Sequence, residues 1–187
     1  MRFRHLEFNL LQLIALIVYK LFLVWLPGSY TPIIGKVPRL LRYWCCKHIF
    51  LECGENVNVE RFANFGSSLG FNVIIGNNSS IGKNCTLPRF IEIGEDVMMG
   101  PECYFLSANH SFDNVEEPMR KQGNSGHKKI IIEDDVWIGR QVIFRPGRTV
   151  KKGSIVAAGC ELSKDFPEYS IIGGNPCRLI RSRKQSK

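Results

Sequence analysis

Apolar side chains recur at every sixth residue through most of this chain, and that period constrains the fold more than any other feature. Stepping by six from Leu51 reaches an apolar residue each time as far as Phe105, and the series resumes at Ile132. Because 44% of the residues are hydrophobic, two unbroken series of this length do not follow from composition. The positions are Leu51, Val57, Ala63, Leu69, Ile75, Ile81, Leu87, Ile93, Met99 and Phe105, then Ile132, Ile138, Phe144, Val150, Val156 and Leu162.

The period excludes an α-helix, whose repeat of about 3.6 residues would carry these side chains around its surface. Six residues fit one short strand and one turn. Glycine often follows the apolar residue, as in Ile75-Gly76 and Ile81-Gly82, and Asn78 lies at such a corner. Both residue types tolerate turn geometry. The sequence therefore predicts the hexapeptide repeat of a parallel β-helix, whose stacked coils share one core.

Composition narrows the class further. The chain has 187 residues, which suits one substantial domain. Its net charge of +8 suits a polyanionic partner such as nucleic acid, an acidic membrane or a phosphorylated cofactor. No nucleic-acid-binding motif is present, so we expect no nucleic acid partner. Seven cysteines without C-x-x-C spacing predict buried thiols in a reducing cytoplasm rather than a disulfide framework or a zinc site.

Residues 1–50 form an apolar and basic segment that we expect to be helical. The stretch 8–26 is almost entirely apolar and nearly long enough to span a membrane, but Lys20 would lie inside such a span. Asn9, Gln12 and Lys20 share roughly one helical face. Three arrangements fit: a helix on an anionic membrane surface, a helix packed on the protein or a neighbouring subunit, and a true span. The pattern predicts peripheral membrane contact through residues 1–26, at the inner face of the cell membrane, for a cytoplasmic protein. Basic residues flank the stretch at Arg2, Arg4, Lys36, Arg39, Arg42 and Lys47.

Residues 106–129 interrupt the repeat with a polar stretch that contains Pro118 and two histidines, His110 and His127. Such a stretch cannot stay in the coil, so we expect an extruded loop that carries the chemistry. The predicted organisation is a helical segment at 1–50, a β-helix at 51–165 with the loop 106–129, and a basic C-terminal tail at 166–187.

The chain resembles the hexapeptide-repeat acetyltransferases, in particular the maltose, galactoside and polysaccharide O-acetyltransferase branch. The resemblance covers about residues 51–181 and implies an all-β, left-handed parallel β-helix. The motifs that carry it are Ser107-Ala108-Asn109-His110, Asp134-Asp135-Val136-Trp137-Ile138-Gly139, Pro146-Gly147, Ala157-Ala158-Gly159, Ser163-Lys164-Asp165 and Gly174-Asn175-Pro176-Cys177-Arg178-Leu179-Ile180-Arg181.

The resemblance also implies roles for individual residues. His110 would be the catalytic base, since histidine titrates near neutrality. The backbone at Gly139 and Arg140 would meet the oxyanion of the tetrahedral intermediate. His127 has no counterpart in the motifs, so we expect a hinge or surface residue. The acceptor pocket would include Asn84, Asn109 and Trp137, although a packing role for Trp137 fits equally well.

Acetyl-CoA is the implied co-substrate, and no metal is implied. Arginine and lysine are the usual phosphate ligands, and the tail 181–184 either adds to this phosphate contact or is solvated. Similar enzymes are homotrimers with sites between subunits, so we expect a homotrimer. The cofactor-binding residues would be Ala158, Gly159, Ser163, Lys164, Arg178 and Arg181.

The acceptor is less constrained. Sugar-acetylating relatives often place a carboxylate in the coil before the loop, whereas residues 86–90 contain none, and Arg89 there suits an anionic or larger glycan. Together with the apolar N-terminus, this favours a glycan or polysaccharide precursor, such as a lipid-linked glycan. The alternatives are a xenobiotic or amino-sugar N-acetyltransferase and a non-catalytic β-helix scaffold. A γ-type carbonic anhydrase would need three histidines at a zinc site, and the repeat region offers two.

Overall fold

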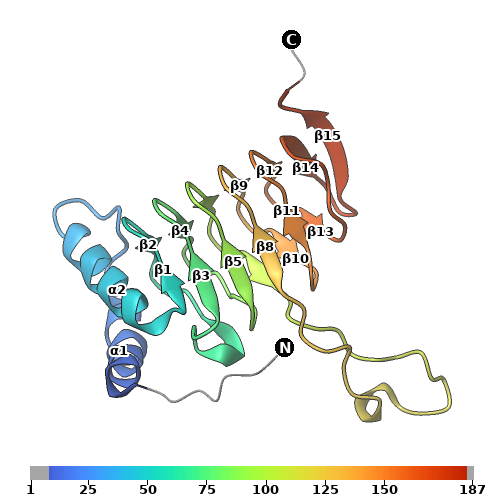
Figure 1. The fold of residues 1–187 in the computed structure, drawn as a ribbon, viewed down its shortest axis with the longest axis horizontal. Helices are drawn as coiled ribbons and strands as arrows, with labels where there is room; N and C mark the ends of the chain where they lie inside the picture. Colours follow the sequence, from blue (N-terminus) through green and yellow to red (C-terminus); the bar gives the residue numbers. More distant parts are fainter. Residues whose placement is uncertain (1–8, 185–187) are drawn as a thin grey trace.

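The computed structural model describes residues 9–184, which form a stack of triangular coils with two helices at one end and a long loop at the side (Figure 1). Strands from successive coils pair in parallel, so each face of the stack is a parallel sheet. The predicted parallel β-helix is therefore confirmed.

Three faces make up the β-helix. The first contains β1 (Glu52–Cys53), β3 (Val73–Ile75), β5 (Ile91–Ile93), β8 (Ile130–Ile132) and β11 (Thr149–Val150). The second contains β2 (Asn58–Val59), β4 (Ser80–Ile81), β6 (Met98–Met99), β9 (Trp137–Ile138), β12 (Ile155–Val156), β14 (Ser170–Gly173) and β15 (Arg178–Ser182). The third contains β7 (Tyr104–Phe105), β10 (Ile143–Phe144) and β13 (Glu161–Leu162).

The pairing register explains the six-residue period. Ile75 pairs with Ile93, which is three six-residue units further along the chain. Ile93 then pairs with Ile132, so the coil closes across the extruded loop without losing register. The inward side chains are buried, and the rings of Phe105 and Phe144 stack with centroids 4.3 Å apart. A continuous apolar core therefore runs through the coils.

The first coil differs from our expectation. Cys53 pairs with Ile75 at a spacing of 22 residues, against 18 between Ile75 and Ile93, so this coil holds four extra residues. A short 3-10 helix, η2 (Gly66–Ser68), lies in the added length. As a result Leu51 and Leu69, which we expected in the inward stack, are 60% and 37% exposed. Cys53, Val59 and Phe65 lie in register with the inward stack instead.

The thiols follow the prediction in part. All seven cysteines are free, and every one except the half-buried Cys53 is buried. Burial raises the pKa of the Cys45 and Cys160 thiols to about 11. These thiols therefore act as small apolar core groups rather than as nucleophiles.

Two helices cover the end of the stack at the first coil (Figure 1). They are α1 (Leu10–Leu21) and α2 (Lys36–Ile49), joined through the 3-10 helix η1 (Leu23–Trp25). Asn9 and Gln12 begin α1 with a capping box. The Tyr19 hydroxyl donates to the carbonyl of Ala63 at 3.1 Å, which ties α1 to the first coil.

A buried arginine holds α2 in place. Arg42 is 0% exposed and donates to the carbonyls of Val59 at 2.8 Å and Pro27 at 3.0 Å. It also donates to the Ser29 hydroxyl at 3.1 Å, and the backbone N–H of Ser29 donates to the Glu60 carboxylate. The expected helical segment is therefore present, and it packs on the protein through one face. Among residues 9–184, every helix is too short or too polar to cross a bilayer, and the part of the predicted membrane contact at residues 1–8 lies outside the described residues.

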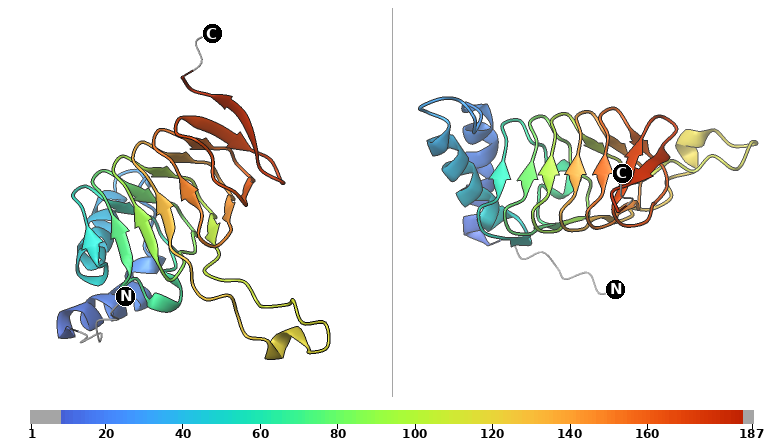
Figure 2. Two further views of the ribbon diagram at one scale, coloured as in Figure 1. Left: turned by 45° about the vertical axis from the view of Figure 1, so that its right-hand side comes forward. Right: turned by 90° about the horizontal axis from the view of Figure 1, so that it is seen from above.

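The segment from residue 166, which we expected as a basic tail, continues the β-helix. Strand β14 pairs in parallel with β12, and β15 returns antiparallel to β14 (Figure 2). Arg183 contacts Asp135, and Lys184 contacts Glu168 at 2.6 Å. Arg183 and Lys184 are thus paired on the protein surface, and residues 185–187 lie outside the described part of the chain.

Candidate active site

His110 lies on the extruded loop, which forms a two-stranded ribbon where it leaves the coils. His110 and Asn124 face each other in an antiparallel bridge. The N–H of Ser111 donates to the carbonyl of Gly123 at 3.2 Å, and the N–H of Ser125 donates to the carbonyl of Asn109 at 2.8 Å. The His110 side chain is exposed, so its imidazole is open to a substrate.

The base of the ribbon is fixed to the β-helix. The backbone N–H of Arg89 donates to the Ser107 hydroxyl at 2.8 Å, and the N–H of Lys128 donates to the carbonyl of Ser107 at 3.0 Å. The loop projects away from its own coils (Figure 2). Within residues 9–184, no hydrogen bond, ion pair or ring contact joins His110 to Asn84, Trp137 or Arg140. Within residues 9–184, the exposed imidazole is therefore not tied to these predicted partners.

The predicted acceptor residues lie at separate places. Trp137 is in β9, in register between Met98 and Ile155, and its side chain is 50% exposed on the outer face of that sheet. Asn84 is exposed at a coil corner with a positive φ of 57°. Asn109 directly precedes His110 and uses its backbone in the ribbon. The structure thus brings Asn109 next to His110 and leaves Asn84 and Trp137 on the coils.

Of the two backbone N–H groups expected to meet the oxyanion, those of Gly139 and Arg140, one is available. The N–H of Gly139 donates to the carbonyl of Val156 at 2.7 Å, so it is used by the coil. Among the residues that the structure describes, the N–H of Arg140 has no acceptor, and neither has that of Ala158, one coil further. The Arg140 guanidinium is held aside by Glu102 at 3.0 Å. Two backbone donors on neighbouring coils, about 4.8 Å apart, suit a thioester carbonyl and an amide oxygen.

The residues predicted for the cofactor gather at the C-terminal coils. Gly159 has a positive φ of 70°, and a β-carbon there would meet open space, so the backbone is accessible. Arg178, Arg181 and Lys164 are exposed, and none of these three contacts a carboxylate within residues 9–184. The Ser163 side chain lies 3.3 Å from the Cys177 sulfur. Exposed cations beside open backbone fit the phosphates and pantetheine of coenzyme A.

Sequence reasoning missed the groups that hold these residues. Ser125 fixes the ribbon beside His110, Ser107 fixes its base, and Glu102 orients Arg140. The only signal for the ribbon was the Asn124-Ser125-Gly126 sequence, which is typical of a turn. These contacts form only once the coil brings distant segments together.

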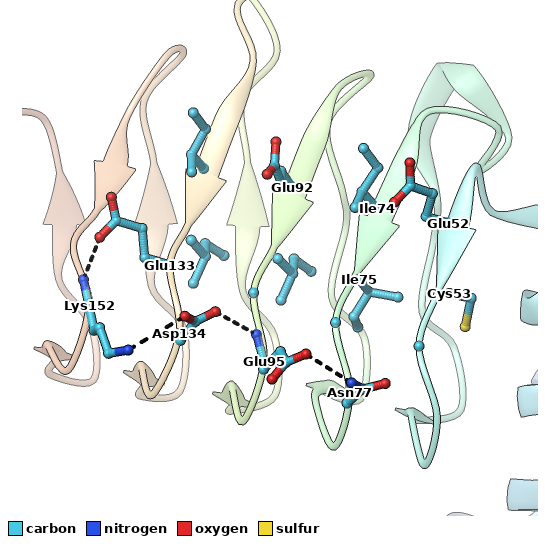
Figure 3. A pocket seen from close by; sticks show the side chains of 16 residues that line it. Glu52, Cys53, Ile74, Ile75, Asn77, Glu92, Glu95, Glu133, Asp134 and Lys152 are labelled. Carbon is cyan, nitrogen blue, oxygen red and sulfur yellow. Dashed lines mark hydrogen bonds and ion pairs between the residues drawn. The ribbon is translucent and has the colours of Figure 1, made fainter.

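A hollow of about 550 Å³ lies apart from these residues, on the outer face of β1, β3, β5 and β8 (Figure 3). Several of its acidic side chains are engaged with neighbours: Asp134 contacts Lys152 at 3.7 Å, and Glu95 accepts from the Asn77 amide at 2.8 Å. None of the predicted site residues lines it, so we assign it no part in the chemistry. Among residues 9–184, no group of three His, Cys, Asp or Glu side chains is placed to bind a metal.

Comparisons with known proteins agree with this fold. No family model matches the chain. Galactoside O-acetyltransferase from Lactococcus lactis is 36% identical over 144 residues, which cover 75% of this chain and 67% of that relative.

Solved structures match over more of the chain. A hexapeptide-repeat acetyltransferase from Vibrio cholerae superimposes with a TM-score of 0.71 and 28% identity over 94% of this chain and 88% of its own, and it has also been solved with acetyl-CoA. A galactoside acetyltransferase in complex with coenzyme A gives a TM-score of 0.70 and 27% identity over 94% of this chain and 84% of its own.

The fold and these matches define a left-handed β-helix acyltransferase. More particularly, the chain belongs to the hexapeptide-repeat acetyltransferases, and acetyl-CoA is its co-substrate. The family, the class of enzyme and the co-substrate that the sequence predicted are thereby confirmed.

Proposed function

We propose that the chain transfers the acetyl group of acetyl-CoA to a sugar hydroxyl of a glycan or polysaccharide precursor. The observation that carries the proposal is the exposed His110, held on an ordered ribbon in a chain related to galactoside O-acetyltransferases. A histidine whose neighbours Asn109 and Ser111 are hydrogen-bonded across the ribbon, and whose side chain is open, suits general-base catalysis.

In the proposed reaction, the His110 imidazole accepts the proton of the acceptor hydroxyl as the hydroxyl oxygen attacks the thioester carbonyl carbon. The N–H of Arg140 donates to the oxyanion that forms. The carbon–sulfur bond then breaks, the acetyl group stays on the sugar oxygen, and the imidazolium returns its proton to the thiolate of coenzyme A.

The cofactor is proposed to lie along the later coils. The N–H of Ala158 and the open backbone of Gly159 would contact the pantetheine. Ser163 and Lys164 would lie nearer the nucleotide, and Arg178 and Arg181 on β15 would bind phosphate oxygens.

The direction of the loop supports a homotrimer. Because the loop projects from its own coils, the imidazole needs a second wall to enclose a substrate (Figure 2). A neighbouring subunit would supply that wall, bringing His110 of one chain to Trp137 and Arg140 of another. A molar mass three times that of the chain in sedimentation equilibrium would support this assembly, and a monomeric active enzyme would contradict it.

The acceptor class rests on the pocket residues. Asn84, Asn109 and Trp137 offer amides and an exposed ring, which suit hydroxyl groups and the apolar face of a sugar. The exposed Arg89 at the base of the loop favours an anionic or extended glycan, such as a lipid-linked precursor at the inner membrane face.

An acceptor panel tests this function. Coenzyme A release is measured with neutral disaccharides, anionic oligosaccharides, lipid-linked oligosaccharides, amino sugars and aminoglycoside drugs. We expect the highest kcat/KM with an oligosaccharide hydroxyl. Acetylation on nitrogen, identified by mass spectrometry of the product, would favour an N-acetyltransferase and overturn the proposed acceptor. Absence of both turnover and acetyl-CoA binding would overturn the enzyme reading in favour of a scaffold.

A further inference from the structure

Helix α1 is apolar on two sides. Ala15, Leu16 and Tyr19 are buried against the protein. A second stripe at spacings of three and four residues points away from the protein and is exposed. A helix that is hydrophobic on every side is normally covered on every side. The residues of this second stripe are Leu10, Leu13, Ile14, Ile17 and Leu21.

Helix α2 repeats the arrangement. Cys45, Cys46 and Ile49 pack inward, while a second apolar stripe at the same helical spacing is exposed. Because α1 and α2 lie side by side at the end of the stack, the two stripes belong to one end of the molecule (Figure 1). The exposed residues of α2 are Val37, Leu40, Leu41 and Trp44.

The turn between the helices adds two highly exposed apolar side chains. Ile33 is 100% exposed, and Tyr30 is 85% exposed. Ile33 also has a φ of 69°, a left-handed conformation that is an outlier for a β-branched residue. A fully solvated isoleucine in a strained conformation contributes nothing to the fold of the single chain, which indicates a role outside it.

The charged side chains of the two helices at this end of the molecule are basic. The sequence contains no aspartate or glutamate from Phe8 to Leu51. Lys20 and Lys36 are exposed, and neither contacts a carboxylate within residues 9–184. Exposed lysines, aliphatic stripes and aromatic rings on one surface are typical of a structure that lies in the headgroup region of an anionic bilayer. Protein–protein interfaces, by contrast, are depleted in lysine.

We infer that the outward stripes of α1 and α2 and the turn 30–34 form a docking surface for an anionic lipid bilayer. Ile33 and Val37 insert among the acyl chains, and Lys20 and Lys36 meet lipid phosphates. Membrane binding does not depend on the acyl transfer. It is related to the proposed function only because it would place the loop near an acceptor held at the membrane.

Vesicle flotation of the full chain tests this surface. The probes are vesicles of phosphatidylcholine alone and vesicles in which about one third of the lipid is phosphatidylglycerol. One variant is Ile33→Asn, because asparagine tolerates positive φ and the exposed isoleucine packs against nothing. The second is Lys20→Glu with Lys36→Glu. The matched controls are Val115→Asn and Lys83→Glu, which change exposed residues far from the helices in sequence.

We expect the unmodified chain to float with the anionic vesicles. Ile33→Asn should lower the partition coefficient about tenfold, since it withdraws one large aliphatic side chain from the bilayer. The lysine variant should lower the partition coefficient about tenfold or more, and on anionic vesicles only. High salt should weaken binding of the unmodified chain to anionic vesicles in the same way. Both controls should bind as the unmodified chain does.

Three results would overturn the inference. The chain could fail to float with anionic vesicles, or Ile33→Asn could bind undiminished. Alternatively, Ile33→Asn could reduce the molar mass of the protein in solution, which would make this face an interface between copies of the chain. Coenzyme A release with a soluble oligosaccharide, measured on the same samples, distinguishes loss of docking from failure of the proposed reaction.

Discussion

Asn109 and Ser125 exchange two hydrogen bonds across the loop that carries His110. The N–H of Ser125 donates to the carbonyl of Asn109 at 2.8 Å, and the N–H of Asn109 donates to the Ser125 hydroxyl at 3.1 Å. Asn109 directly precedes His110, and Ser125 directly follows Asn124, the residue that faces His110 across the ribbon. The position of the imidazole therefore depends on a serine that never touches the substrate in our account.

Ser125→Ala removes the hydroxyl acceptor and should loosen the ribbon. We expect kcat to fall about tenfold, because small misplacement of a catalytic group is costly, with KM for acetyl-CoA unchanged. Steady-state kinetics measures both. Ser125→Thr keeps the hydroxyl and should restore most of the activity. A wild-type kcat in Ser125→Ala would remove Ser125 as a positioning residue.

Arg178→Ala combined with Arg181→Ala tests the phosphate contacts. Charge-assisted hydrogen bonds contribute about 1.5–3 kcal/mol each, so KM for acetyl-CoA should rise about tenfold or more. The smaller thioester acetyl-pantetheine, which lacks the nucleotide, should be used equally by both enzymes. Arg183→Ala is the control, since Arg183 already contacts Asp135. Equal losses with both thioesters would contradict the assignment.

Arg42→Ala should destabilise the protein severely. The substitution leaves the buried carbonyl of Val59 and the partly buried carbonyl of Pro27 without this donor. Each unsatisfied buried group costs about 1–3 kcal/mol, so the free energy of unfolding should fall by about 3 kcal/mol or more. Urea unfolding measures it. The control is Arg39→Ala, which removes a single exposed hydrogen bond to Asn56 and should cost less than about 1 kcal/mol. Similar losses in both variants would show that Arg42 has no special role.

Glu60 should make stability depend on pH. Burial alone would raise the pKa of this carboxyl. Hydrogen bonds from Ser29 and Asn58 and the charge of Arg42 together outweigh that effect, so its pKa lies below the ordinary value. A lowered pKa in the folded state stabilises the protein fully above the ordinary carboxyl pKa. The contribution is lost as the pH falls through the folded pKa. Urea midpoints below about pH 4.5 should decline more steeply for the unmodified chain than for Glu60→Gln. Parallel declines would mean that Glu60 does not contribute.

The repeat period predicted the coils but hid the longer first coil. Val57 and Val59 in the first coil are both buried, although they lie two residues apart. Four extra residues displace the six-residue step by two residues, so that it falls on the buried Val57 and Ala63 and on Leu51 and Leu69, which are apolar but exposed. Periodicity alone therefore cannot distinguish this insertion from a regular coil.

The C-terminal strand and the site show where sequence reasoning ends. Basic residues from Arg178 onward suggested a tail, yet β15 gains backbone hydrogen bonds from β14 whatever its side chains. His110 could be proposed from the sequence because a motif surrounds it. Ser125, Glu102 and Ser107 were not, since their partners lie 16–38 residues away in sequence and meet them only in the folded coil.

The role of His110 is the central claim, and His110→Ala tests it most directly. Coenzyme A release is followed with saturating acetyl-CoA and the best oligosaccharide acceptor, beside His127→Ala as the control on the same loop. Loss of a general base should lower kcat by about 10²-fold or more in His110→Ala, with acetyl-CoA binding retained, while His127→Ala stays near wild type. Release that survives in His110→Ala, or falls equally in both variants, would contradict the account.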